Sequence, residues 1–322
     1  MSLALVFPGQ GSQSPGMGKA LFEQFASARE VFQSVDDALG QKLTQTMFEG
    51  PEAELSLTAN AQPALMAVSL AALRVLQAEA GLDIKRDVAF VAGHSLGEYS
   101  ALAAADAFSV PVAARLLRLR GEAMQRAVPA GQGAMAALIG LDLATARLVA
   151  SEAAAATSLV CEVANDNGGG QIVVSGAKAA IDAAIEIAKA KGAKRAILLQ
   201  VSAPFHCSLM APAAAEMATA LANITLNPPC VPLVANVSAA ATSQAPEIQK
   251  MLVQQVTGTV RWAESIAYMA RQGVTQFVEI GSGKVLSGLI RRIVDGAVTV
   301  SVGTPADIPG LESILQKGSS NV

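Results

Sequence analysis

The segment Val88-Ala-Phe-Val-Ala-Gly-His-Ser-Leu-Gly-Glu-Tyr99 carries an apolar run into a helical run through a short G-x-S-x-G turn. The small residues Gly93 and Gly97 permit a tight strand-to-helix turn, which would expose the hydroxyl of Ser95. This context predicts a nucleophile elbow at the carboxyl end of a buried strand. The alternative interpretation is a glycine-flanked turn without chemistry.

Apolar runs and Ala/Leu-rich helical stretches alternate along most of the chain. A parallel sheet covered by helices has this pattern, because its strands are buried on both faces. We therefore expect a hydrolase-like α/β body. The expected strands are Leu3–Phe7, Val88–Ala92, Ile197–Val201 and Gln276–Ile280, and the clearest helices are Pro63–Ala80 and Pro111–Met124.

The pattern changes between Gly131 and Val201, where the predicted order is βαββαβ. This order is typical of a ferredoxin-like unit. Its predicted strands are Ala134–Gly140, Leu159–Ala164, Gln171–Ser175 and Ala196–Val201, and its predicted helices are Ala144–Ala155 and Ala179–Gly192. We therefore expect a ferredoxin-like subdomain at 129–200, inserted into a larger hydrolase-like domain that residues 1–128 and 201–322 form.

The composition describes a folded globular protein, since 52% of the 322 residues are hydrophobic and 15% are charged. The formal net charge is −3 and only 4% of residues are aromatic. A nucleic-acid binder usually has a broad positive field and stacking surfaces, so nucleic acid is not an expected partner. The longest uncharged stretches, Leu55–Leu73 and Met217–Pro246, are interrupted by Asn, Gln and Pro. No membrane span is therefore expected.

Cysteine usage indicates a reducing compartment. Cys161, Cys207 and Cys230 are odd in number and far apart, and no C-x-x-C pair is present. The run Leu3–Phe7 is too short for a signal peptide and no basic residue precedes it. A cytoplasmic location is expected. With two histidines and scattered carboxylates, neither a metal nor a cofactor is expected.

A serine hydroxyl needs a base that takes its proton, and histidine is the usual one. His94 directly precedes Ser95 in the turn and is poorly placed to reach its neighbour's Oγ. We interpret His94 as a turn residue that hydrogen-bonds locally. His206 lies in the loop Ser202–Cys207 and is the candidate base by elimination, with a buried structural histidine as the alternative.

Two further features could complete a site. The loop Phe7–Gln13 contains two glycines, and a backbone N–H from it could join that of the residue after the nucleophile in an oxyanion hole. A plain glycine-rich turn is the alternative. Arg120 could hold a substrate carboxylate with its planar fork, or it could be a solvated surface residue.

Six motifs follow one another along the chain. They are Phe7-Pro-Gly-Gln-Gly-Ser-Gln13, Gly93-His-Ser-Leu-Gly-Glu98, Leu119-Arg-Gly121, Phe205-His-Cys207, Gln255 before Val260-Arg-Trp262, and Glu279-Ile-Gly-Ser-Gly-Lys-Val-Leu286. Together they resemble the malonyl-CoA:acyl-carrier-protein transacylase family, over about residues 3–303. The resemblance implies an acyltransferase of fatty-acid synthesis that moves malonyl from malonyl-CoA to acyl carrier protein. It also implies a malonyl-serine intermediate, ping-pong kinetics and no cofactor.

The resemblance assigns the central roles in catalysis. In that family the residue that matches Ser95 is acylated, and the one that matches His206 is its base. The backbone carbonyl at the position of Gln255 orients that histidine. The arginine that matches Arg120 binds the malonyl carboxylate.

The same resemblance assigns roles around the acyl group. Backbone N–H groups at the positions of Gln10 and Leu96 form the oxyanion hole. Asn167 matches a loop residue that faces the cleft. Phe205 lies beside the base at a position that is often Ser in bacterial members, and a Phe-His pair is familiar from malonyl-selective acyltransferase domains of polyketide synthases.

Other functions stay open at this point. A malonyl transferase of a polyketide or malonate decarboxylase system shares every motif and differs in its carrier. A serine esterase normally adds an acid between Ser and His along the chain. A carrier-binding module without catalytic activity is the remaining alternative.

Acyl carrier proteins are acidic as a class, so we expect basic residues near the cleft to dock the carrier. The candidates are Lys191, Lys194, Arg195, Arg291 and Arg292. The alternative is that these residues are solvated helix ends.

Overall fold

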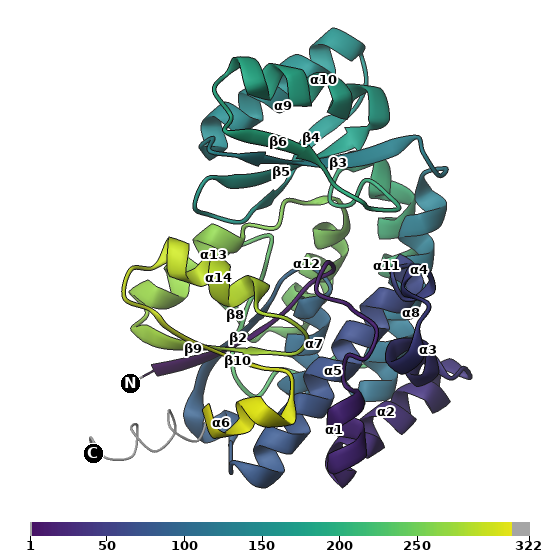
Figure 1. Ribbon diagram of the computed structural model, residues 1–322, viewed down its shortest axis with the longest axis vertical. Helices are drawn as coiled ribbons and strands as arrows, with labels where there is room; N and C mark the ends of the chain where they lie inside the picture. The colour runs from purple at the N-terminus through teal and green to yellow at the C-terminus, as the bar shows by residue number, and fades with distance from the viewer. Residues whose placement is uncertain (1, 311–322) are drawn as a thin grey trace.

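The computed structural model describes residues 2–310, which form two sheets with helices around them (Figure 1). The first sheet has six strands in the order β10-β9-β1-β2-β7-β8. They are β1 (Ser2–Phe7), β2 (Val88–Gly93), β7 (Leu233–Val234), β8 (Ala241–Thr242), β9 (Val274–Ile280) and β10 (Val298–Val302). Neighbouring strands are parallel except β7 and β8, which are antiparallel. The predicted α/β class with a parallel sheet is confirmed.

Helices cover both faces of this sheet. They are α1 (Lys19–Gln24), α2 (Ala26–Leu39), α3 (Leu43–Glu49), α4 (Glu52–Leu55), α5 (Thr58–Glu79), α6 (Ile84–Asp87), α7 (Gly97–Ala104), α8 (Val110–Ala127), α11 (Ala211–Ala222), α12 (Ala245–Thr257), α13 (Trp262–Arg271) and α14 (Val285–Ile293). Alternate residues of β1 point to opposite faces. Leu5 and Phe7 join the core that contains α5 and α7, whereas Ala4 and Val6 join the core that contains α13 and α14. Short 3₁₀ helices lie at Ser208–Met210 and Pro305–Asp307.

Helix α5 is the central helix of the larger core. It begins at Thr58, ahead of the predicted start at Pro63. Its first turn packs closely against Gly121 of α8, because a Cβ at Gly121 would lie 2.6 Å from the Cα of Ala59. By length and hydropathy α5 could cross a membrane, but 89% of its most apolar window is buried inside the protein. It is therefore a core helix here.

The second sheet lies above the first in Figure 1. It consists of β3 (Gly133–Ile139), β4 (Cys161–Asp166), β5 (Gln171–Ala177) and β6 (Arg195–Leu198), in the order β4-β5-β3-β6. All its neighbouring strands are antiparallel. The helices α9 (Leu143–Thr157) and α10 (Lys178–Ala190) cover one face and share with it a core of their own.

Strand β6 ends at Leu198, before the predicted end at Val201. It pairs antiparallel with β3 in the second sheet, so the prediction that Ile197–Val201 is a strand of the parallel sheet is wrong. Leu199 still donates a backbone hydrogen bond to Met135 of β3, and the chain then leaves the sheet. Leu199, Gln200 and Val201 line a cavity between the two sheets. The strand therefore ends where the chain returns toward the helices that cover the first sheet.

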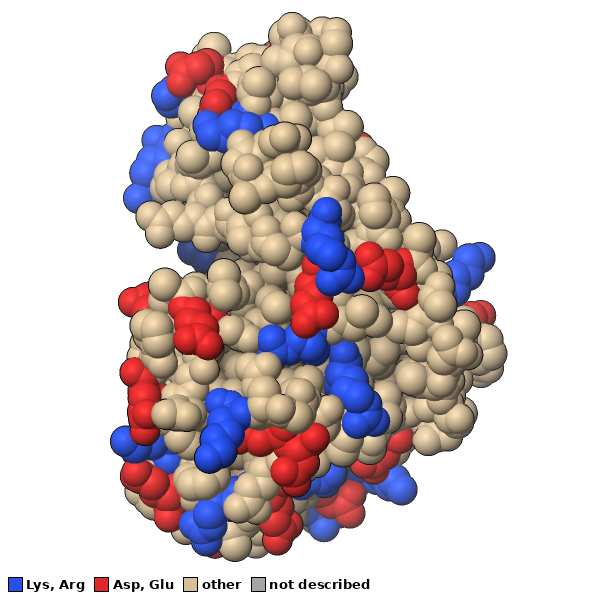
Figure 2. All heavy atoms as spheres, turned by 90° about the vertical axis from the view of Figure 1, so that its right-hand side faces the viewer, with Lys and Arg blue, Asp and Glu red and all other residues tan. Residues whose placement is uncertain are grey.

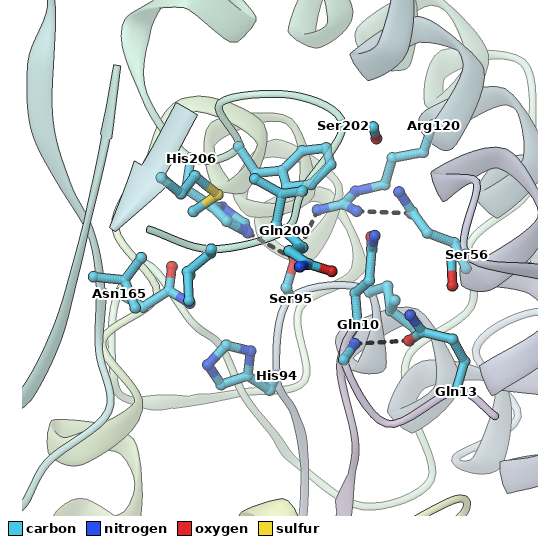
Figure 3. Close-up of a pocket in the computed structure, with 18 of the residues that line it drawn as sticks. Gln10, Gln13, Ser56, His94, Ser95, Arg120, Asn165, Gln200, Ser202 and His206 are labelled. Carbon is cyan, nitrogen blue, oxygen red and sulfur yellow. Dashed lines mark hydrogen bonds between the residues drawn. The ribbon is translucent and has the colours of Figure 1, made fainter. Parts of the chain in front are cut away.

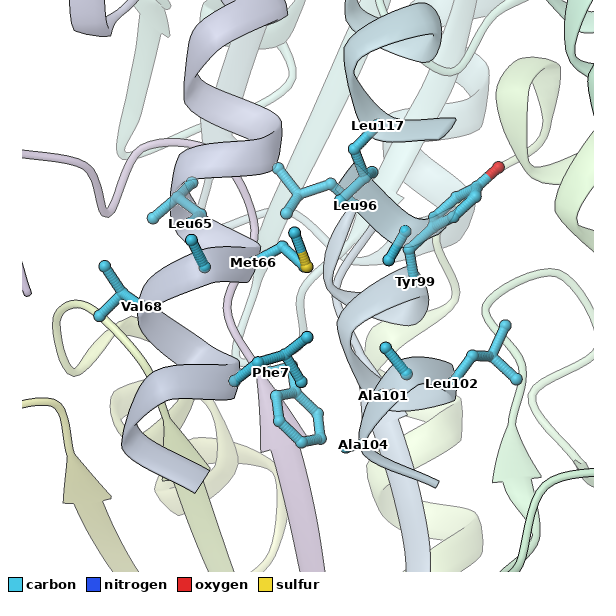
Figure 4. Close-up of a cluster of buried hydrophobic side chains, with 14 of the residues drawn as sticks. Phe7, Leu65, Met66, Val68, Leu96, Tyr99, Ala101, Leu102, Ala104 and Leu117 are labelled. Carbon is cyan, nitrogen blue, oxygen red and sulfur yellow. The ribbon is translucent and has the colours of Figure 1, made fainter. Parts of the chain in front are cut away.

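The core beneath the serine turn is closely packed (Figure 4). Phe7 at the end of β1, Met66 of α5 and Ala101 of α7 are all fully buried within it. Leu96 directly follows the serine and is 1% exposed. The turn is thus anchored to two helices and a central strand.

Candidate active site

Ser95 lies at the apex of the turn between β2 and α7. Its φ of 53° places it in the left-handed region, as expected of a strained strand-to-helix turn. A Cβ on Gly93 would overlap the backbone of Gly97, and a Cβ on Gly97 would overlap the carbonyl group of Phe7 in β1. Only glycine fits at both positions. The turn therefore has the predicted elbow geometry.

The structure brings together the three residues of the predicted catalytic set. Ser95 Oγ lies 2.7 Å from His206 Nε2, and His206 Nδ1 lies 2.8 Å from the backbone oxygen of Gln255. Because a carbonyl oxygen only accepts, Nδ1 carries the proton and Nε2 is left free to accept the serine proton. His206 also has a positive φ of 60°.

The environment of His206 keeps its ring neutral. Burial first, and then the positive charge of Arg120, lower the pKa of His206 from 6.5 to about 3. Only 3% of the residue is exposed. A neutral imidazole is the form that can take a proton, and its free Nε2 faces the serine hydroxyl, so the geometry suits a general base.

His94 corrects one prediction. Its ring does not hydrogen-bond locally, because Nε2 lies 2.9 Å from Oδ1 of Asn167 in the loop between β4 and β5. The ring also lies against Trp262, with centroids 5.6 Å apart. Burial lowers the pKa of His94. His94 therefore links the serine turn to the second sheet.

Arg120 is 1% exposed, so its interpretation as a solvated surface residue is wrong. Helix α8 directs the guanidinium toward the serine (Figure 3). Nη2 lies 3.2 Å from Ser95 Oγ and donates at 2.8 Å to Oε1 of Gln255. Nη1 donates at 2.7 Å to Oε1 of Gln62 on α5. A permanent cation is thus held beside the nucleophile by two neutral amides.

Three polar residues that the sequence analysis missed complete this network. Asn236, after β7, accepts from the Ser95 N–H at 2.8 Å and donates to the oxygen of Gly93 at 2.7 Å. Glu98, on α7, accepts from the side chain of Gln255 at 2.7 Å. Gln62 is the amide that holds Arg120. Glu98 could have been found, because it is the last residue of the Gly93–Glu98 motif. Asn236 and Gln62 are single amides in apolar stretches of the sequence, so no local pattern marks them.

A cavity of about 490 Å³ opens above Ser95, between the two sheets. Gln10 and Leu96 line it, and the backbone N–H of each makes no hydrogen bond within residues 2–310. Both donors are thus available to an oxyanion. Phe205 lines the cavity beside His206 and is 8% exposed.

Asn167 does not belong to the lining of the cavity. Its neighbour Asn165 does, while the side chain of Asn167 is used by His94. Within residues 2–310, no three His, Cys, Asp or Glu side chains gather as a metal site would require, and Cys161, Cys207 and Cys230 are free thiols.

Comparison with known proteins places this site in context. The acyl transferase domain family matches residues 4–309. A malonyl CoA-acyl carrier protein transacylase of Bacillus subtilis is 44% identical over 319 residues, which cover 99% of each chain. The crystal structure of an acyl-carrier-protein-S-malonyltransferase from Bartonella henselae has a TM-score of 0.95 and 55% identity, covering 98% of this chain and 100% of that one. A malonyl-transacylase in complex with its type II PKS acyl-carrier protein has a TM-score of 0.93 and 41% identity, covering 98% of this chain and 100% of that one.

Proposed function

This chain belongs to the malonyl CoA-acyl carrier protein transacylase family of acyl transferases, and on that premise we propose that it transfers malonyl from coenzyme A to an acyl carrier protein. The acceptor is the phosphopantetheine thiol of the carrier. The product supplies fatty-acid synthesis. Malonyl-CoA and the carrier are its partners.

One observation carries this proposal: a buried arginine lies beside a serine that is paired with a neutral histidine. Nη2 of Arg120 is 3.2 Å from Ser95 Oγ. Malonyl is a short acyl group that ends in a carboxylate, so an acyl chain on Ser95 would bring that carboxylate to the guanidinium. Burying the carboxylate without such a partner would cost several kcal/mol.

In the first half-reaction, His206 Nε2 takes the hydroxyl proton of Ser95 while Oγ attacks the thioester carbonyl of malonyl-CoA. The backbone N–H groups of Gln10 and Leu96 donate to the oxyanion. The C–S bond then breaks, and coenzyme A leaves as a thiol with the proton from His206. A malonyl ester of Ser95 remains.

In the second half-reaction, the carrier thiol gives its proton to His206, and its sulfur attacks the malonyl ester. The same two N–H groups stabilise the second oxyanion. The ester C–O bond breaks, and Ser95 recovers its proton from His206. The carbonyl oxygen of Gln255 keeps the imidazole in the required tautomer through both steps, and Phe205 forms an apolar wall beside it. Asn167 holds the ring of His94, which lines the cavity, through a contact of 2.9 Å.

We also propose a division of the chain. Residues 129–200 form an inserted ferredoxin-like subdomain, and residues 2–128 with 201–310 form the hydrolase-like catalytic domain. The rest of the predicted division, residues 1 and 311–322, lies outside the described residues. The βαββαβ order, the strand order β4-β5-β3-β6 and the separate core of the second sheet support this division. A cytoplasmic location is consistent with the three free thiols.

Two alternatives differ in support. A polyketide carrier is the stronger one, since one similar structure is a complex with a type II PKS acyl-carrier protein. A serine esterase is weaker, because His206 Nδ1 donates to a backbone carbonyl where an esterase would place an acid.

The test is a transfer assay with labelled malonyl-CoA and purified carriers. We expect label on a fatty-acid carrier that bears phosphopantetheine, and none on the same carrier without that group. Faster transfer to a polyketide carrier would move the assignment to that pathway. Release of free malonate with no label on any carrier would contradict transfer altogether.

A further inference from the structure

A buried carboxyl group lies behind the malonyl-binding side of the site. Glu98 on α7 is 0% exposed. Its Oε2 accepts at 2.7 Å from Nε2 of Gln255 and at 3.2 Å from the backbone N–H of Asn236. Its Oε1 has no partner among the described residues. The mechanism above makes no use of this carboxyl group.

The side chain of Gln255 connects Glu98 to Arg120. Its Oε1 accepts from the guanidinium at 2.8 Å, while its Nε2 donates to Glu98 and, at 3.0 Å, to the backbone oxygen of Ser95. One amide therefore stands between a buried cation and a buried acid. It holds the guanidinium and the carboxyl group in one hydrogen-bonded chain.

Among residues 2–310, the remaining neighbours leave Arg120 as the charge that opposes Glu98. Tyr99, next to it on α7, has a pKa raised to about 12 by burial and stays neutral. The segment after β7 and helix α12 contribute the uncharged amides of Asn236 and Gln255. His206, across the guanidinium, is neutral at working pH.

Burial raises the pKa of Glu98 to about 7, against the opposing effects of its hydrogen bonds and of Arg120. Neutral pH therefore lies within the range over which this group titrates. A second anion on Arg120 would disfavour the ionised form further, because like charges in a buried site repel.

We propose that Glu98 couples malonyl binding to a proton: its carboxylate balances Arg120 in the empty site and takes up one proton from solvent when the malonyl carboxylate binds. An O–H bond forms on Glu98 and no other bond of the protein changes. This inference rests on the proposed function. Glu98 acts through Gln255 and Arg120 and is a positioning residue.

Linkage gives the sign of the effect. Below pH 7 Glu98 is already protonated, so malonyl binding costs no proton. Above pH 7 each bound malonyl group needs a proton, and its affinity falls by up to about tenfold per pH unit. An acetyl group has no carboxylate and should not show this fall.

The test uses Ser95→Ala, which binds acyl-CoA without reacting. Isothermal titration gives the ratio of the acetyl-CoA to malonyl-CoA dissociation constants between pH 6 and pH 9. The shared coenzyme cancels in this ratio. We expect the preference for malonyl to fall at least about fivefold above pH 7, and to stay constant with pH when Glu98→Gln is added. Glutamine retains an oxygen that can accept both hydrogen bonds made to Oε2.

Glu122→Gln is the matched control, because it removes the same charge from a half-exposed acid on α8. With this substitution the preference for malonyl should still fall above pH 7. Titration of Ser95→Ala in buffers of different ionisation enthalpy counts the protons directly, without any change at Glu98. At pH 8 we expect uptake of about half a proton or more with malonyl-CoA and almost none with acetyl-CoA.

Two results would overturn the inference and leave the proposed function standing. One is an equal fall of the malonyl preference with pH after Glu98→Gln is added, and the other is no proton uptake by the Ser95→Ala protein. Failure of malonyl-CoA to bind at every pH would instead contradict the proposed function itself.

Discussion

At the scale of single residues, the guanidinium of Arg120 is held 3.2 Å from Ser95 Oγ by Gln62 and Gln255. Arginine suits this place because its planar fork can bond both oxygens of a carboxylate and it stays charged at any working pH. Acetyl and malonyl differ only by that carboxylate. The residue therefore has a direct means of choosing between them.

Arg120→Ala should lower malonyl transfer steeply, by about a hundredfold or more, since a buried carboxylate would lose its partner. Acetyl transfer should stay unchanged or rise. Arg115→Ala, an exposed arginine on the same helix, is the control and should alter neither rate. Equal slowing of both transfers in a folded Arg120→Ala variant would make Arg120 a structural residue.

His206 should also affect how stability depends on pH. Its pKa is lowered from 6.5 to about 3 in the folded chain, so between these values the unfolded chain binds more protons. The contribution of His206 to the free energy of unfolding is therefore complete above pH 6.5 and decreases as the pH falls. At pH 5 the loss from this group is about 2 kcal/mol.

Denaturant titrations at pH 7 and pH 5 measure this effect. His206→Gln, which cannot titrate, should lose less stability than the parent over the same interval. The same variant should lose several orders of magnitude in turnover, because the base is gone. Identical pH dependence in both proteins would mean that the histidine has the same pKa in the folded chain as in the unfolded chain, which would contradict the lowered pKa.

At the scale of elements, the β2-turn-α7 unit is the feature that the sequence predicted best. A Cβ on Gly93 would overlap Gly97, and a Cβ on Gly97 would overlap the carbonyl group of Phe7. The spacing of the two glycines in the sequence was therefore enough to predict the tight turn. The end of β6 at Leu198 was missed, because it depends on where the chain crosses between two sheets. Asn236 was missed for the same reason: it bonds to Ser95 across 141 positions of sequence, and no local pattern records that contact.

The close approach of α7 to β1 predicts the outcome of one substitution. Gly97→Ala would place a methyl group on the carbonyl of Phe7 and should destabilise the protein by about 3 kcal/mol or prevent folding. Gly288→Ala on α14 is the matched control, because open space surrounds that glycine. It should be neutral or stabilise by up to about 1 kcal/mol. Equal unfolding midpoints for the two variants would refute this packing argument.

At the scale of the whole molecule, two of the predicted docking residues, Lys194 and Arg292, lie where the second sheet meets α14. Lys194 covers Gly140, Arg292 covers Gly169, and Gly140 donates a backbone hydrogen bond to Gly170. Acidic and basic side chains are intermixed on the face that Figure 2 shows. A local basic cluster, more than the net charge, would therefore guide an acidic carrier.

Reversing Arg291 and Arg292 to Glu should raise the KM for the carrier at low ionic strength and leave loading from malonyl-CoA unchanged. The effect should shrink as salt screens the charges. The control reverses Lys85 and Arg86 on α6, away from the junction. A second variant also reverses the charges of Lys191, Lys194 and Arg195. If the KM for the carrier is unchanged in this variant too, another surface docks the carrier.

The central claim is that a single serine carries the malonyl group between the two partners. The intact mass of the protein after mixing with malonyl-CoA tests it most directly, with peptide mapping to locate the adduct. We predict one malonyl group on Ser95, its loss when carrier is added, and no adduct in Ser95→Ala. An unmodified protein that still transfers malonyl, or an adduct on any other residue, would contradict the account.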